Sequence, residues 1–178
     1  MRSALFAILL VVSACGSDEA PADLGESHAP VVPRAESDLP APPVLGRAAV
    51  LPGGRRVEAR RGAEPGESDL FLVDADGKAT PLAPAAGPDE LPLALADGRV
   101  AFVSGRSTVA SIWIVDPNSG ALAQLTNRGL VAGKPWRGFV PPPARDFREM
   151  SGALAYDDGS GRRWRVHLAN GRGEEESR

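Results

Sequence analysis

The sequence contains one cysteine, Cys15, and two histidines, His28 and His167. A lone cysteine excludes an internal disulfide. A single histidine after the first forty residues, without a nearby cysteine, excludes the usual zinc ligand sets. No apolar run after Val12 is long enough to span a bilayer. The folded part must therefore be stabilised by its own core, and we expect neither a metal nor a cofactor.

Aromatic residues make up 5% of the chain, against 20 glycines and 17 prolines, a balance typical of a turn-rich protein. The 20 basic and 23 acidic residues give a net charge of -3, which becomes -4 if Arg2 is removed with a leader peptide. This acidic balance does not favour nucleic-acid binding.

Residues 1–14 have the pattern of a secretory signal: one charge at Arg2, an apolar run and then small residues. Val12-Ser13-Ala14-Cys15 resembles the lipobox of bacterial lipoproteins. In that family a peptidase cuts before the cysteine, which then carries fatty acyl chains. The resemblance implies that Cys15 is lipidated and attaches the protein to a membrane. The residue after it is Gly16, not Asp, which by the family's sorting rule favours the outer membrane over the inner membrane.

Residues 15–43 combine prolines and acids with no hydrophobic period. Such a segment cannot bury enough surface to offset its chain entropy, so we expect a disordered tether. Residues 44–171 are expected to form the folded domain, and residues 172–178 a disordered acidic tail.

The domain is repetitive. Leu70-Phe71-Leu72-Val73-Asp74 and Ile112-Trp113-Ile114-Val115-Asp116 are 42 residues apart, and each precedes a glycine turn and a second short strand. A turn and a strand at 97–104 precede the second hairpin, and 53–59 is a weaker copy. A degraded third copy covers 151–157 and 164–171, after a proline-rich insertion at 141–150. Repeats of about 40–45 residues with four short strands are typical of β-propeller blades.

Residues 97–106, 112–120 and 124–127 resemble the TolB-like propeller repeat. The match fails at 94–98, where a Trp-Ser-Pro-Asp-Gly turn is expected, and 134–136 recovers only a Pro-Trp pair. The resemblance implies an all-β fold, a partial or open propeller-like array of about three four-stranded antiparallel blades. It also implies function through loops and blade faces that bind other proteins.

Closed propellers need about four to eight blades, and this chain has room for three. The sequence is compatible with three arrangements: closure between copies in a homo-oligomer, an open three-sheet stack, or a different small β-fold. Exposed strand edges would promote association unless charge or proline blocked it.

Candidate sites each have a structural alternative. Asp74, Asp76, Asp116 and Asn118 have the spacing of calcium ligands, but the glycine follows too early, and turn capping explains them better. Arg55, Arg56, Arg60 and Arg61, with Arg47, form either a patch for anionic lipids or a charged edge strand. Trp136 and Trp164 could stack on a glycan, or could pack structurally as Trp113 does.

These patterns contain no nucleophile paired with a base: Ser160 lies in a turn, and His167 has no partner. We therefore expect a non-enzymatic envelope lipoprotein whose domain binds a protein partner. One alternative is a lipoprotein that binds glycan or lipid through Trp136, Trp164 and the arginines. A hydrolase with an unrecognised site, and an eroded propeller fragment with no independent role, are further alternatives.

Overall fold

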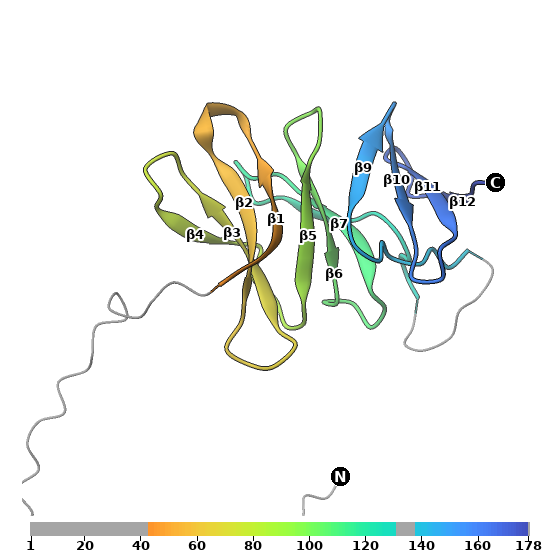
Figure 1. Ribbon diagram of the computed structural model, residues 1–178, viewed down its shortest axis with the longest axis horizontal. Helices are drawn as coiled ribbons and strands as arrows, with labels where there is room; N and C mark the ends of the chain where they lie inside the picture. The colour runs from red at the N-terminus through yellow and green to blue at the C-terminus, as the bar shows by residue number, and fades with distance from the viewer. Residues whose placement is uncertain (1–42, 131–137, 178) are drawn as a thin grey trace, which may run out of the picture. The chain divides into compact units, whose positions relative to one another are not determined.

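The computed structural model describes residues 43–130 and 138–177, which form three successive antiparallel sheets (Figure 1). All of them belong to one unit, Pro40–Arg178. The predicted fold class, an open propeller-like array of three four-stranded blades, is confirmed. The signal segment, Cys15 and the tether lie outside the described residues, so those predictions are not tested.

Each blade is a meander whose strands pair in the order of the sequence. The first blade contains β1 (Val44–Val50), β2 (Arg56–Arg61), β3 (Ser68–Val73) and β4 (Ala79–Leu82), with the 3-10 turn η2 (Pro52–Gly54) between β1 and β2. The second contains β5 (Asp89–Ala94), β6 (Val100–Ser104), β7 (Ser111–Val115) and β8 (Leu122–Gln124). The third contains β9 (Phe147–Met150), β10 (Ala153–Asp157), β11 (Arg163–His167) and β12 (Gly173–Glu175).

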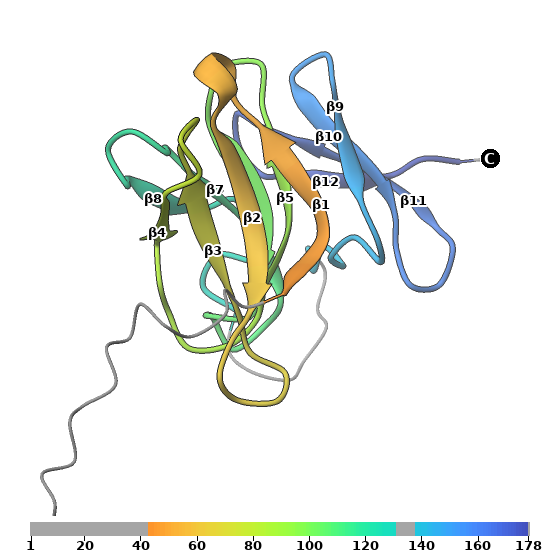
Figure 2. The ribbon, with the colours of Figure 1, turned by 60° about the vertical axis from the view of Figure 1, so that its left-hand side comes forward.

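The second blade lies between the other two and is buried on both faces (Figures 1 and 2). Val100 and Phe102 pack in the cluster shared with the first blade, whereas Ala101, Ile112 and Ile114 pack in the cluster shared with the third. Because successive side chains on a strand point to opposite faces, a strand covered on both sides is apolar throughout. This explains the continuous apolar runs at 100–103 and 112–115.

A buried polar network connects the first two blades. Ser104 donates a hydrogen bond to the Asp89 carboxylate at 2.6 Å, and Arg106 forms an ion pair with it at 2.5 Å. Ser68 of the first blade donates to the Asp89 carbonyl oxygen at 3.0 Å. Burial raises the pKa of the Asp89 carboxyl, and Ser104 and Arg106 oppose that rise. Removing one partner would leave an uncompensated buried charge, so the network fixes how the blades meet.

The predicted turns are confirmed as turns. The amide of Leu95 donates to the carbonyl oxygen of Arg99 at 2.8 Å, and Leu51 repeats this bond with Arg55 at the same length. The Asp116 carboxylate accepts a bond from the Asn118 amide at 2.8 Å, as expected of a capping residue. Within residues 43–130 and 138–177, no group of three acidic, histidine or cysteine side chains could hold a metal.

Two boundaries were wrong. The segment 141–150, interpreted as an insertion, ends in β9, because Phe147 supplies the one buried side chain that the innermost strand of a third blade needs. The segment 172–178, expected to be a disordered tail, contains β12, whose glutamates form ion pairs with Arg162 and Arg172, and Glu176 just after it pairs with Arg165 of β11.

The outward faces of the two end blades are charged. On β2, Val57 and Ala59 face the second blade, whereas Arg56, Glu58 and Arg60 alternate with them on the opposite side. On the third blade, Arg163 and Arg165 lie opposite Asp157 and Ala155 of β10, away from the core. Neither end offers the apolar surface on which another blade would pack, which favours the open stack over closure between copies.

Candidate functional site

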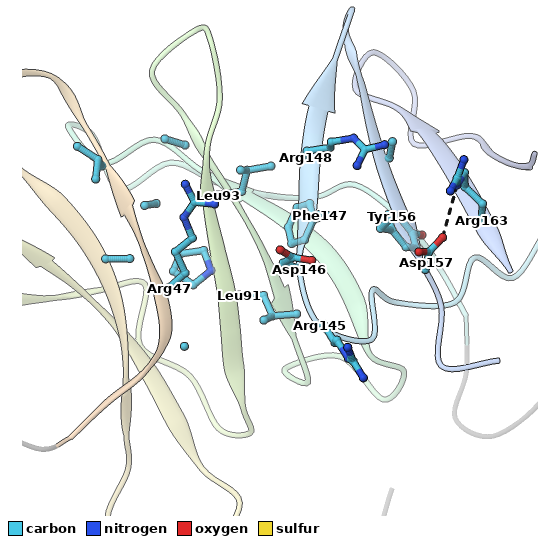
Figure 3. A pocket seen from close by; sticks show the side chains of 17 residues that line it. Arg47, Leu91, Leu93, Arg145, Asp146, Phe147, Arg148, Tyr156, Asp157 and Arg163 are labelled. Atoms are coloured by element: carbon cyan, nitrogen blue, oxygen red, sulfur yellow. Dashed lines mark ion pairs between the residues drawn. The ribbon is translucent and has the colours of Figure 1, made fainter. Parts of the chain in front are cut away.

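The first strands of the three blades, β1, β5 and β9, border a cavity of about 790 Å³, which we call the inner cavity (Figure 3). Its volume is in the range of small-molecule and peptide sites. β1 and β5 lie side by side, and β5 contacts β9. The cavity therefore draws residues from all three repeats, which are far apart in the sequence.

The apolar part of the inner cavity comes from Leu91, Leu93, Phe147 and Tyr156. The rings of Phe147 and Tyr156 meet edge to face, with their centroids 6.5 Å apart. The Tyr156 hydroxyl donates to the carbonyl oxygen of Pro141 at 2.7 Å. Burial raises the pKa of Tyr156 well above its ordinary value, so the hydroxyl stays protonated. This part of the lining is rigid and offers a surface for apolar side chains.

Charged side chains surround this apolar part. Arg47, Arg145 and Arg148 are exposed and form no ion pair with any described residue, whereas Arg163 pairs with Asp157 at 3.6 Å. Asp146, which also lines the cavity, has no ion pair within the described ranges. Figure 3 shows the labelled arginines spread across the site instead of converging on one point. The rim is therefore positive over a broad area, which suits an extended anionic partner better than a single small ion.

Both β1 and β5 are bulged where they border the cavity. The pairing of β1 with β2 shifts between Leu45 and Ala49, and that of β5 with β6 shifts between Glu90 and Leu93. Gly46 has a φ of 69° and Leu91 a φ of 55°. Glycine adopts such a φ freely, but leucine is strained there. Bulges and strained residues occur often beside binding sites, so this feature supports the inner cavity as the functional site.

Replacing Leu91 by glycine tests the strain. The substitution removes apolar packing, which lowers the free energy of unfolding. It also relieves the backbone strain at the positive φ, which raises that free energy by about 1 to 2 kcal/mol. Leu93→Gly is the matched control, since Leu93 packs in the same cluster without a positive φ. Urea unfolding is expected to show that L93G loses about 1 to 2 kcal/mol more stability than L91G. Equal losses would show that Leu91 is not strained.

The arginines of the predicted patch are mostly engaged by other side chains. Arg56 and Arg60 both form ion pairs with Glu58, the latter at 3.0 Å. Burial alone would raise the pKa of Glu58, but the two arginines outweigh it and lower the pKa. Arg55 donates to Asn118 at 3.0 Å, and Arg61 is exposed without an ion pair among the described residues. β2 lies inside its sheet, so Arg56, Arg60 and Arg61 are not on an edge strand, whereas Arg47 is on β1, at one edge of the sheet.

Of the two predicted tryptophans, the structure describes Trp164 alone, and it does not lie with these arginines. Trp164 lies in the third blade, and its indole N–H donates to the buried Asp158 carboxylate at 3.0 Å. Trp136 lies outside the described residues. Trp113 packs against the cluster between the first and second blades, as expected. The arginines stand on the first blade, with the second blade between them and Trp164.

Within residues 43–130 and 138–177, the two side chains considered as catalytic candidates, Ser160 and His167, are not paired with each other. The Ser160 hydroxyl donates to Asp158 at 2.7 Å and serves the turn. His167 faces Glu174 at 3.8 Å on the outward side of the third blade. No helix of the described part could span a membrane.

Replacing Asp158 tests how Trp164 is held. Burial alone would raise the pKa of Asp158, but bonds from Ser160, Arg162 and Trp164 lower it from 3.8 to about 2. The carboxylate therefore stabilises the fold above pH 4, and that stability is lost as the pH falls toward 2. Asp158→Ala is expected to lower the free energy of unfolding by about 1 to 3 kcal/mol at pH 7.

Urea unfolding at pH 7 and at lower pH measures both effects, and the variant should lose less stability between pH 4 and pH 2 than the native chain. Asp157→Ala removes an exposed neighbour and should change the stability by about 0.5 kcal/mol or less. Equal effects of the two substitutions would contradict the account of Trp164.

Sequence reasoning missed the inner cavity. Arg47 was noted only as a member of the arginine cluster, and Arg145, Phe147 and Arg148 were placed in an insertion. The order of strands within a repeat could have identified these residues. The first strand of each blade borders the cavity, so residues on the first strand of each repeat are the candidates.

Comparison with known proteins supports the fold. Solved structures similar to this chain include TolB from Acinetobacter baumannii, which is 17% identical and superposes with a TM-score of 0.53. The match covers 74% of this chain and 32% of that chain. Putative TolB from Agrobacterium tumefaciens has 18% identity and a TM-score of 0.53, with 74% and 45% covered. The chain thus spans less than half the length of either. No protein-family model and no curated protein matches the sequence. At this identity the likeness establishes the fold, which is TolB-like.

Proposed function

We propose that this protein is an envelope lipoprotein whose β-repeat domain is a non-catalytic module that binds another protein. The observation that carries the proposal is the inner cavity, where an apolar lining, a positive rim and two bulged strands come together. The TolB-like fold supports it, because blade arrays place their loops and inner strands where a partner can reach them.

Attachment to the membrane is part of the proposal. Removal of residues 1–14 would leave Cys15 at the start of the chain, where acyl chains would hold it to the membrane. Residues 15–43 would then act as the tether, and the domain would lie in the periplasm or at the cell surface. Gly16 after the cysteine favours the outer membrane over the inner membrane.

Substitution of Cys15 tests the anchor. In cells fed labelled palmitate, the native chain is expected to carry the label and to sediment with the outer-membrane fraction. Cys15→Ser is expected to lose both. A Cys15→Ser chain that still sediments with membranes would contradict lipid anchoring.

The binding role can be tested by photo-crosslinking in the full chain. A photoreactive residue at Leu93, inside the inner cavity, is expected to form an adduct with a specific envelope protein. The same group at Lys78, in an exposed turn of the first blade, is the control and should not. Arg47→Glu combined with Arg148→Glu should reduce the adduct at least tenfold, because the rim would change sign. Adducts that are equal at both positions, or that survive the charge reversal, would contradict the proposal.

A glycan- or lipid-binding role is a separate alternative that does not rest on the inner cavity, because none of its described residues lines that cavity. That alternative uses Trp136, Trp164, Arg55, Arg56, Arg60 and Arg61, and it requires ligand affinity that falls when the two tryptophans are replaced. Calorimetry with envelope glycans and anionic lipids distinguishes it from protein binding.

A further inference from the structure

The strand β12 covers the outer edge of β11, the last strand of the third blade that contributes to the core. Trp164 lies opposite Glu175, Arg165 opposite Glu174 and Val166 opposite Gly173. Beyond the strand, the amide of Glu176 donates to the carbonyl oxygen of Arg163 at 2.9 Å. Without β12, the backbone groups of β11 on this side would be available to another strand.

Charge holds β12 in place. Its side chains and that of Glu176 form ion pairs with three arginines: Arg165–Glu176 at 3.1 Å, Arg172–Glu174 at 3.3 Å and Arg162–Glu175 at 3.7 Å. The imidazole of His167 also lies 3.8 Å from the Glu174 carboxylate. The paired side chains are between 33% and 74% exposed, so water and salt screen them. By contrast, β4 of the first blade buries Leu82 in the core.

Packing contributes at one position only. A Cβ added to Gly173 would lie 2.6 Å from a methyl carbon of Val140, so this glycine sits tightly against the blade. Neither Glu174 nor Glu175 is buried. Loss of β12 would uncover Val140, but Val166 and Trp164 would still pack against Leu154, Tyr156 and their neighbours through the sheet face.

We propose that β12 is a displaceable strand and that the edge of β11 is a docking surface for an extended acidic segment of another protein. Such a segment would pair with β11 by β-strand addition, in the place of residues 173–176. Arg162, Arg163 and Arg165, which lie along and beside this edge, would select acidic side chains. This surface belongs to the third blade alone and does not depend on the proposed role of the inner cavity.

Hydrogen exchange of residues 163–167, followed by mass spectrometry in the full chain, tests the proposal. The variant carries Glu174→Lys, Glu175→Lys and Glu176→Lys, so that residues 173–176 repel the arginines. The control carries Glu64→Lys, Glu67→Lys and Glu90→Lys, which change the net charge equally at positions without an ion pair among the described residues. The probe is the synthetic peptide Gly-Glu-Glu-Glu-Ser, and a peptide with lysines in place of the glutamates is its control.

Exchange at 163–167 is expected to accelerate at least tenfold in the variant, with 153–157 and the control chain unchanged. The acidic peptide should slow that exchange again at low salt and not at high salt, and the lysine peptide should have no effect. Unchanged exchange in the variant would overturn the proposal, as would accelerated exchange that the acidic peptide does not slow. If circular dichroism shows that the triple lysine variant is unfolded, the corresponding triple glutamine variant gives the same readouts.

Discussion

The burial of the second blade on both faces is the constraint on which the rest of the structure depends. Val100, Phe102 and Val115 are fully buried in the cluster shared with the first blade, and Ile112 is fully buried in the cluster shared with the third. Each such side chain contributes about 1.5 to 3 kcal/mol when it is removed from water. Neither end blade has a second apolar face, so both depend on the middle blade for their cores.

The charged outward faces are the counterpart of that burial. A three-blade array leaves two blade faces uncovered, and an apolar face there would drive association. The Arg56–Glu58–Arg60 group covers one face, and the arginines of β11 with their acidic partners cover the other. Repeat proteins use polar terminal units in the same way. An array that stays open also leaves β1, β5 and β9 accessible, and the inner cavity is a consequence of that opening.

The sequence was sufficient to predict what local physics determines. The hairpins at 70–82 and 112–124 follow from apolar runs joined by Asp-Gly or Asn-Ser-Gly turns, and the alternating faces follow from strand geometry. β9 has the sequence Phe-Arg-Glu-Met. It was missed because only its phenylalanine is typical of a buried strand. β12 was missed because Gly-Glu-Glu has a low strand propensity, and its pairing with β11 and its ion pairs with Arg162 and Arg172 are visible only in the structure.

The site required more than the repeat pattern. Leu91 gives no sign in the sequence that its φ is positive, because that conformation occurs where the pairing of β5 with β6 is interrupted. Arg47 and Arg148 are a hundred residues apart, and only the arrangement of the blades brings them to one cavity. The alternation of Arg56, Glu58 and Arg60 was visible in the sequence, but the burial of Glu58 between the two arginines is visible only in the structure.

The solution mass of residues 43–178 tests the central claim, that three blades form a stable stack without closing. Analytical ultracentrifugation should give the mass of one chain, with a circular dichroism spectrum typical of β-structure, at concentrations up to the millimolar range. A folded dimer or larger ring would contradict the account, because it would require the charged outward faces to be buried against one another.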